Sequence, residues 1–143
     1  MKPELMNPLV LAYLGDGVFE VYVREHLVVE RGIVKPDLLQ KEAILYVSAK
    51  AQSEFMKEAI LNNWVSEEEI AIYKRGRNAK NTRVMKNTSV VVHNQSSGFE
   101  ALIGHLYLKK KDERISEIFD LYKEFVLRKV WDKIEKNLRH FKG

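Results

Sequence analysis

The sequence predicts an all-α fold, a bundle of about five or six helices in a single domain that spans residues 1–143. Apolar residues recur every three or four positions through most of the chain, as they do on one face of a helix. Helix-start signals, namely Pro or Ser ahead of an apolar run, precede several of these segments. Only the run from Val90 to Val92 is typical of a strand.

The first half of the chain carries two long helical patterns. Apolar spacing predicts a helix over residues 8 to about 29. Pro36 suits the first turn of the next helix, whose pattern continues to Ile60 with a break near Ser48. Ser66 and Glu69 then have the spacing of a capping box. This box predicts a short helix that reaches residue 73.

The second half predicts one buried and one amphipathic helix. Ser97 and Glu100 are also spaced as a capping box, so a helix is expected to begin there and continue through the apolar residues 101–108. Residues 109–112 are expected to be a connection. From Glu113 onward the apolar spacing predicts a long amphipathic terminal helix.

Positive charge is concentrated in the one long stretch without helical periodicity. No Asp or Glu occurs between Glu69 and Glu100, and six cations give this segment a charge of +6 against −2 for the rest of the chain. Asn, Thr, Ser and Gly residues interleave with the cations and can hydrogen-bond or approach phosphate oxygens. A solvated loop is one interpretation; we favour a surface that binds a polyanion.

Asp16 is the first candidate functional residue, because a carboxylate inside an apolar helix needs a compensating partner. Glu20 lies one helical turn along the same face and Arg24 one turn further, so the three could form a ladder of salt bridges. A divalent cation such as Mg²⁺ or Mn²⁺ is the alternative partner, since both prefer oxygen ligands. Taken alone, these residues favour the salt bridge. Glu100 is similarly open, as a helix cap or as a carboxylate that faces Asp16.

Several classes of protein are excluded or disfavoured by composition. The chain has no Cys, which excludes disulfides, thiolate metal sites and a Cys nucleophile. Its four His residues are scattered, so no zinc site is expected. No apolar run approaches the roughly 18 residues that a membrane span needs. We therefore expect a cytoplasmic protein without a membrane partner.

Five stretches resemble the ribonuclease III family. Residues 11–17 (LAYLGDG) and 99–108 (FEALIGHLYL) are similar to the two signature helices of its catalytic domain. Residues 19–24, 47–52 and 74–80 resemble one subfamily, mini-ribonuclease III, which lacks the double-stranded-RNA-binding domain of ordinary members. The resemblance implies a helical endonuclease domain that forms a two-fold homodimer. It also implies Mg²⁺-dependent cleavage of double-stranded RNA, with Mn²⁺ as a substitute.

The resemblance also assigns roles to individual residues. Asp16 becomes a catalytic residue and a metal ligand together with Glu100, and Glu20 is a further candidate ligand. Lys50 and Gln52 are candidates for additional RNA contacts. The expected RNA clamp consists of the polar and basic residues Lys74, Arg75, Arg77, Asn78, Lys80, Arg83 and Lys86.

The subfamily's role implies a natural substrate, the 23S ribosomal RNA precursor, whose ends would be cut to leave 5′-phosphate and 3′-hydroxyl termini. A large-subunit ribosomal protein is a further candidate partner. The dimer face is expected on the first helix, at residues such as Val18, Phe19 and Val21, unless these belong to the core.

The sequence departs from the ordinary family pattern where acids are expected. Leu9, Ala12 and Ser97 stand at positions that carry carboxylates in ordinary ribonuclease III. These differences support one alternative function, a catalytically inactive ribonuclease III fold that binds ribosomal RNA during ribosome assembly.

Overall fold

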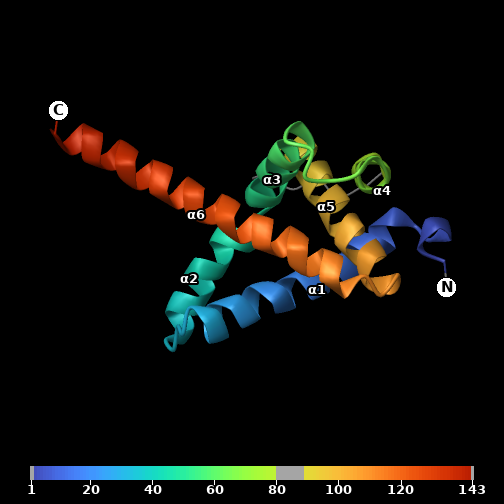
Figure 1. The fold of residues 1–143 in the computed structure, drawn as a ribbon, viewed down its shortest axis with the longest axis horizontal. Helices are drawn as coiled ribbons and strands as arrows, with labels where there is room; N and C mark the ends of the chain where they lie inside the picture. Colours follow the sequence, from blue (N-terminus) through green and yellow to red (C-terminus); the bar gives the residue numbers. More distant parts are fainter. Residues whose placement is uncertain (1, 80–88, 143) are drawn as a thin grey trace.

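The computed structural model describes residues 2–79 and 89–142, and in these ranges the chain is helical without any strand (Figure 1). The predicted all-α fold is confirmed. The six α-helices are α1 (Pro8–Glu25), α2 (Pro36–Val47), α3 (Ala49–Leu61), α4 (Glu67–Arg77), α5 (Val90–Leu108) and α6 (Asp112–Lys142). A short 3₁₀ turn, Pro3–Leu5, precedes α1, and a π-helical turn, His26–Glu30, continues it.

Helix α5 is the centre of the fold. Its residues 96–106 are all buried except Glu100, which is half-buried, as the small and apolar composition of this stretch requires. Helices α1, α4 and α3 make the most extensive contacts with it, in that order. Helix α6 crosses the bundle (Figure 1) and packs on the core that it shares with α1, α3 and α5.

Two glycines let α1 and α5 cross with their backbones in contact. A Cβ on Gly15 would lie 1.8 Å from the carbonyl oxygen of Glu100, and a Cβ on Gly104 would lie 2.1 Å from the carbonyl oxygen of Leu11. Neither position can therefore hold a side chain without moving a backbone. The crossing places Asp16, the next residue after Gly15, beside the turn of α5 that carries Glu100.

Helix α4 approaches the same turn of α5 in a similar way. A Cβ on Gly76 would lie 2.7 Å from the Cβ of Ala101, and one on Gly98 would lie 2.6 Å from the carbonyl oxygen of Tyr73. The basic end of α4 is thereby held against the part of α5 that contains Glu100.

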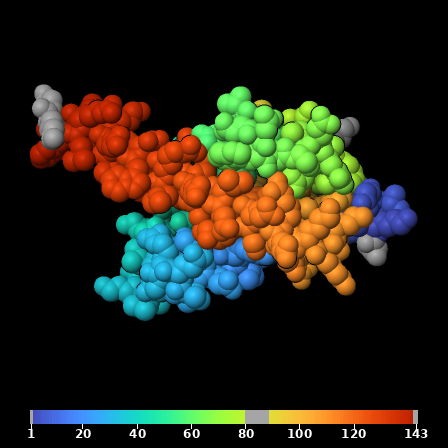
Figure 2. Space-filling model, viewed as in Figure 1, coloured from blue at the N-terminus to red at the C-terminus, as the bar shows by residue number. Residues whose placement is uncertain are grey.

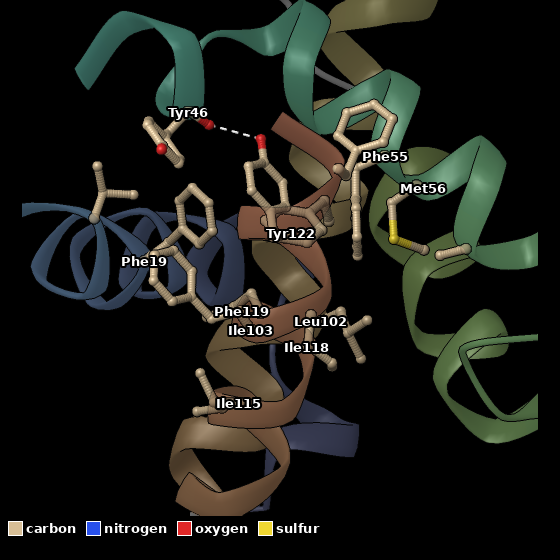
Figure 3. Close-up of a cluster of buried hydrophobic side chains, with 14 of the residues drawn as sticks. Phe19, Tyr46, Phe55, Met56, Leu102, Ile103, Ile115, Ile118, Phe119 and Tyr122 are labelled. Carbon is tan, nitrogen blue, oxygen red and sulfur yellow. Dashed lines mark hydrogen bonds between the residues drawn. The ribbon is translucent and has the colours of Figure 1, made fainter. Parts of the chain in front are cut away.

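An aromatic cluster fills the core between α1, α3, α5 and α6 (Figure 3). Phe19 meets the rings of Phe99 and Tyr122 edge to face, at centroid distances of 5.1 and 4.9 Å. The hydroxyl of Tyr122 is buried, and it donates a 2.6 Å hydrogen bond to the carbonyl oxygen of Tyr46. This bond satisfies the only polar atom of the Tyr122 side chain and ties α6 to α2.

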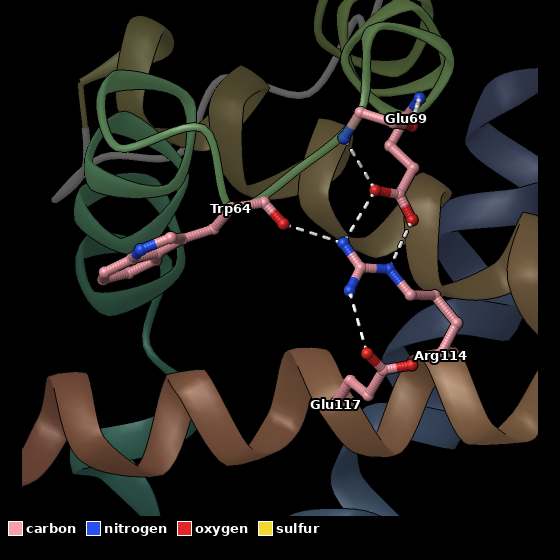
Figure 4. A network of polar contacts seen from close by, with 5 residues as sticks. Trp64, Glu69, Arg114 and Glu117 are labelled. Carbon is pink, nitrogen blue, oxygen red and sulfur yellow. Dashed lines mark hydrogen bonds and ion pairs between the residues drawn. The ribbon is translucent and has the colours of Figure 1, made fainter.

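A polar network joins the start of α4 to the start of α6 (Figure 4). Arg114 donates to both carboxylate oxygens of Glu69, at 2.8 and 2.9 Å, and to the carbonyl oxygen of Trp64 at 2.8 Å. Burial acts to raise the pKa of Glu69, but hydrogen bonds from Arg114 and from the Ser66 backbone outweigh it, so the pKa lies below its usual value. The two helices are therefore linked by a charged pair on the side of the bundle away from α2.

The C-terminal part of α6 extends past the rest of the molecule, where Figure 2 shows it projecting from the body. Residues 131–141 are exposed on all sides. Only the first half of α6 thus belongs to the core that positions α5.

Local signals predicted the helix starts well. Pro36 opens α2, and the break at Ser48 is real, because its hydroxyl accepts from the backbone N–H of Ala51 and caps α3. The capping box of Ser66 and Glu69 is present at α4.

Three expectations are wrong. Val90 to Val92 form the first turn of α5 instead of a strand, because the Ser89 hydroxyl accepts from the N–H of Val92 and starts the helix there. Ser97 lies in the middle of α5 and caps nothing. Helix α4 continues past residue 73 to Arg77, so the first part of the basic stretch is helical.

In the described part of the chain, no helix is long and apolar enough to cross a membrane.

Replacing Gly15 by Ala is expected to destabilise the protein by about 3 kcal/mol or more, because the added methyl group meets a backbone carbonyl that cannot move aside. Gly17→Ala is the matched control, since nothing lies within 4 Å of its Cβ position. That change should stabilise α1 by about 0.5–1 kcal/mol. Urea denaturation of the two variants measures both effects, and equal stabilities would contradict the backbone contact.

Candidate active site

The crossing of α1 and α5 brings two carboxyl groups together. Asp16 is exposed on α1, whereas Glu100 is half-buried on α5, and Asp16 is close enough to affect the ionisation of Glu100. Burial, hydrogen bonding to Asp16 and the negative charge of Asp16 together raise the pKa of Glu100 to about 9. At neutral pH Glu100 therefore holds its proton in the metal-free protein.

Such a pair is suited to a hard divalent cation. Two adjacent carboxylates cannot both ionise in a poorly solvated site unless a positive charge replaces the proton between them. Their four oxygens are the donor type that Mg²⁺ and Mn²⁺ prefer. The donor set at Asp16 and Glu100 thus fits such an ion.

No third acid joins the pair. Glu20 instead accepts a 3.1 Å hydrogen bond from Arg24 Nη2 at the surface of α1. Within residues 2–79 and 89–142, no group of three or more His, Asp or Glu side chains is close enough to hold one ion. Ala12 and Ser97, where ordinary family members carry acids, are buried. Of the ladder of salt bridges that the sequence favoured, the bridge between Glu20 and Arg24 is present. Asp16 lies beside Glu100 instead.

Gln52 lies behind Glu100 and is buried, with 1% of its surface exposed. Its Oε1 accepts a 2.5 Å hydrogen bond from the Ser96 hydroxyl, and its Nε2 is buried without a partner. The carboxamide is close enough to Glu100 to lower its pKa, the smallest of the four influences on that group. The expected RNA contact from Gln52 is therefore wrong. Residues 52, 55, 56 and 59 share the core face of α3, and this spacing was the available signal.

The basic end of α4 forms the outer surface next to the acid pair. Lys74 and Arg75 are exposed, and Arg75 also donates to the carbonyl oxygen of Met6. Arg77 lies over the ring of Tyr73, 5.7 Å from its centroid, and its Nε donates to Asn78 Oδ1 at 3.2 Å. Of the other predicted clamp residues, Lys80, Arg83 and Lys86 lie outside the described residues. Lys50, the other candidate for an additional RNA contact, is exposed on α3.

Comparison with known proteins identifies this arrangement. The model of the Ribonuclease III domain matches residues 9–111, which include the acid pair and the basic end of α4. The chain belongs to the ribonuclease III family. Membership makes it an endoribonuclease and confirms the resemblance that its motifs carry.

Its relatives place the chain in the mini-ribonuclease III group. It is 40% identical over 131 residues to Mini-ribonuclease 3 of Enterococcus faecalis, a match that covers 92% of this chain and 96% of that protein. It is 49% identical over 116 residues to Mini-ribonuclease 3 of Brevibacillus brevis, covering 81% and 84%. A crystal structure of a Fusobacterium nucleatum protein superimposes with a TM-score of 0.76 at 30% identity, covering 87% of this chain and 98% of that one.

Within this ribonuclease III fold, the three residues suggested for a dimer face differ in burial. Phe19 is 2% exposed and belongs to the core, and Val18 packs against that core. Val21 is 63% exposed, and Val10 and Tyr13 on the same helix are 50% and 85% exposed. Helix α1 therefore has an apolar outer side that residues 2–79 and 89–142 leave uncovered.

The raised pKa of Glu100 predicts how the stability of the metal-free protein depends on pH. The native state holds the proton of Glu100 up to about pH 9, whereas the unfolded chain releases it near 4.5, so stability should fall as pH rises through this range. Glu100→Gln should flatten this slope and exceed the wild type by about 1–3 kcal/mol at pH 8. Urea denaturation in a chelator across this pH range tests the prediction. Glu124→Gln, an exposed site on α6, should retain the wild-type slope.

Proposed function

We propose that the chain is a Mg²⁺-dependent endonuclease of double-stranded RNA in which Asp16 and Glu100 hold the metal. The observation that carries this proposal is the enforced contact of two carboxyl groups at the α1–α5 crossing, with the pKa of Glu100 raised to about 9. An acid pair under this constraint is typical of a functional site, since an ordinary fold gains nothing from it.

The chain's own residues prepare the reaction. Bound Mg²⁺ would supply an activated water and neutralise charge on the phosphate. To hold the metal, Glu100 would have to release its proton, so metal affinity should rise with pH. Asp16 lies at the exposed edge of the pair, where RNA would be able to reach it. The glycine crossing keeps both groups in place without reorganisation, which favours catalysis.

The basic end of α4 is proposed to hold the RNA backbone beside the acids. Lys74, Arg75 and Arg77 offer cations to phosphates, and packing of Gly76 on Ala101 keeps them next to the turn with Glu100. Double-stranded RNA is recognised largely through its shape, its phosphates and its 2′-hydroxyls. Lys80, Arg83 and Lys86 extend the same basic sequence and belong to the proposed clamp.

A two-fold homodimer is the proposed working form. The exposed apolar side of α1, with Val10, Tyr13 and Val21, lies on the helix that carries Asp16. Pairing of this side with a second copy would cover it and set two acid pairs on one molecule. Two sites related in this way suit the cutting of both strands of a duplex.

The proposed natural substrate is the 23S ribosomal RNA precursor in the cytoplasm, cut to leave 5′-phosphate and 3′-hydroxyl ends. Membership of the mini-ribonuclease III group supports this choice. A large-subunit ribosomal protein bound to the same precursor would be a partner.

Asp16→Asn should abolish cleavage of a long RNA duplex, and of a transcript with the paired precursor ends, in Mg²⁺. Binding of the duplex should stay near the wild-type level, because the clamp residues are unchanged. Gel analysis of end-labelled RNA measures cleavage, and filter binding measures affinity. Asp132→Asn, exposed on the far part of α6, is the control and should cleave normally. Duplex binding by the wild type without cleavage would instead support the inactive ribosomal RNA-binding module.

Neutralising Lys74 and Arg77 together to Gln should weaken duplex binding and reduce the slope of log affinity against log salt by about 2, one for each lost phosphate contact. Lys133→Gln with Lys136→Gln makes the same change in charge on the projecting part of α6. This control pair should leave the slope unchanged. Equal slopes in both double variants would place the clamp elsewhere.

A further inference from the structure

Gln52 is a buried polar group that the proposed reaction has not used. It extends from α3 into the space behind Glu100, and it is among the most deeply buried side chains of the protein. A buried N–H without a hydrogen-bond partner is unfavourable, and native proteins keep few of them. The unpartnered Nε2 of Gln52 therefore requires an explanation.

Ser96 determines how the carboxamide is oriented. The Ser96 hydroxyl donates to Oε1 at 2.5 Å from one turn before Glu100 on the same helix. Because the amide is planar and its oxygen is held, Nε2 points away from Ser96. Ser96 and Glu100 are four residues apart and share one face of α5, so the carboxamide that Ser96 holds lies on the same face as the Glu100 side chain.

The chemistry of Glu100 supplies the missing partner. A carboxyl group has acceptor oxygens in either protonation state, and a carboxylate has room for about four hydrogen bonds or metal contacts. One oxygen of Glu100 can therefore accept from Nε2 while the group still faces Asp16. Metal-binding carboxylates generally have an outer hydrogen-bond partner of this kind.

We propose that Gln52 is a positioning residue that donates a hydrogen bond from Nε2 to the Glu100 carboxyl group and holds it toward Asp16. This inference rests on the proposed function, because it assigns Gln52 a role at the same metal site. A neutral donor suits a site with only two acids. A carboxylate at position 52 would add a third negative charge in the same buried region, and an apolar residue would leave Glu100 free to rotate.

The test measures binding of Mn²⁺ alone by isothermal titration calorimetry to the wild-type protein, in the absence of RNA. Gln52→Leu preserves the volume and removes the donor, and it should weaken Mn²⁺ binding about 10–100-fold. Ser96→Ala frees the carboxamide to rotate and should give a smaller loss. Ser53→Ala is the matched control, since Ser53 is equally buried on α3 and bonds Gln95 instead of Gln52. It should bind Mn²⁺ as the wild type does.

A kinetic measurement separates positioning from a structural role. At saturating Mn²⁺, Gln52→Leu should recover a kcat close to that of the wild type, while the Mn²⁺ concentration for half-maximal cleavage rises by the same factor as the dissociation constant. A structural role would lower the stability of the metal-free protein and leave Mn²⁺ affinity unchanged, which overturns the proposal. Wild-type affinity in Ser96→Ala overturns the assigned orientation. If the wild type binds no Mn²⁺, or Asp16→Asn binds it equally well, the proposed function itself fails.

Discussion

The structure depends on one close contact, the crossing of α1 and α5 at Gly15 and Gly104. Helices that carry ordinary side chains pack with their axes about 8–10 Å apart, because side chains fill the space between the two backbones. Here the added Cβ of either glycine would overlap a backbone carbonyl of the other helix. This approach presses Asp16 against Glu100, and the raised pKa of Glu100 is its electrostatic consequence.

The rest of the fold keeps that crossing in place. Phe19, one turn after Asp16, is anchored by Phe99 and Tyr122, so α1 cannot slide along α5 without breaking the aromatic cluster. On the opposite flank, the bond between Arg114 and Glu69 holds the start of α4, while Gly76 holds its end. The site is therefore fixed by packing on rigid helices, and its acid pair lowers stability in the metal-free protein, a trade-off typical of functional sites.

Local signals predicted most of the helices but not the site geometry. Pro36, Ser48 and Ser66 act on neighbouring backbone groups, so their effects are readable from the sequence. The strand at Val90 to Val92 failed because a Ser cap and burial against other helices outweighed β propensity. The contact of Asp16 with Glu100 joins distant segments through tertiary packing, so no local pattern reveals it; only family motifs pointed to it. The burial of Gln52 was visible in the helical spacing but was masked by its polar character.

Under the proposed function, a site with only two acids must gain part of its metal affinity from something other than the charge of its ligands. Magnesium usually keeps several waters and is held by one or two carboxylates together with substrate phosphates. Asp16 and Glu100 match that pattern, and the cations of α4 lie where they can hold a phosphate nearby. Under the proposed function, a phosphate of the RNA would then complete the metal site, while the cations of the clamp supply most of the RNA affinity. The lost acids at Leu9, Ala12 and Ser97 are in this sense compatible with catalysis, because fewer negative charges also repel the RNA backbone less.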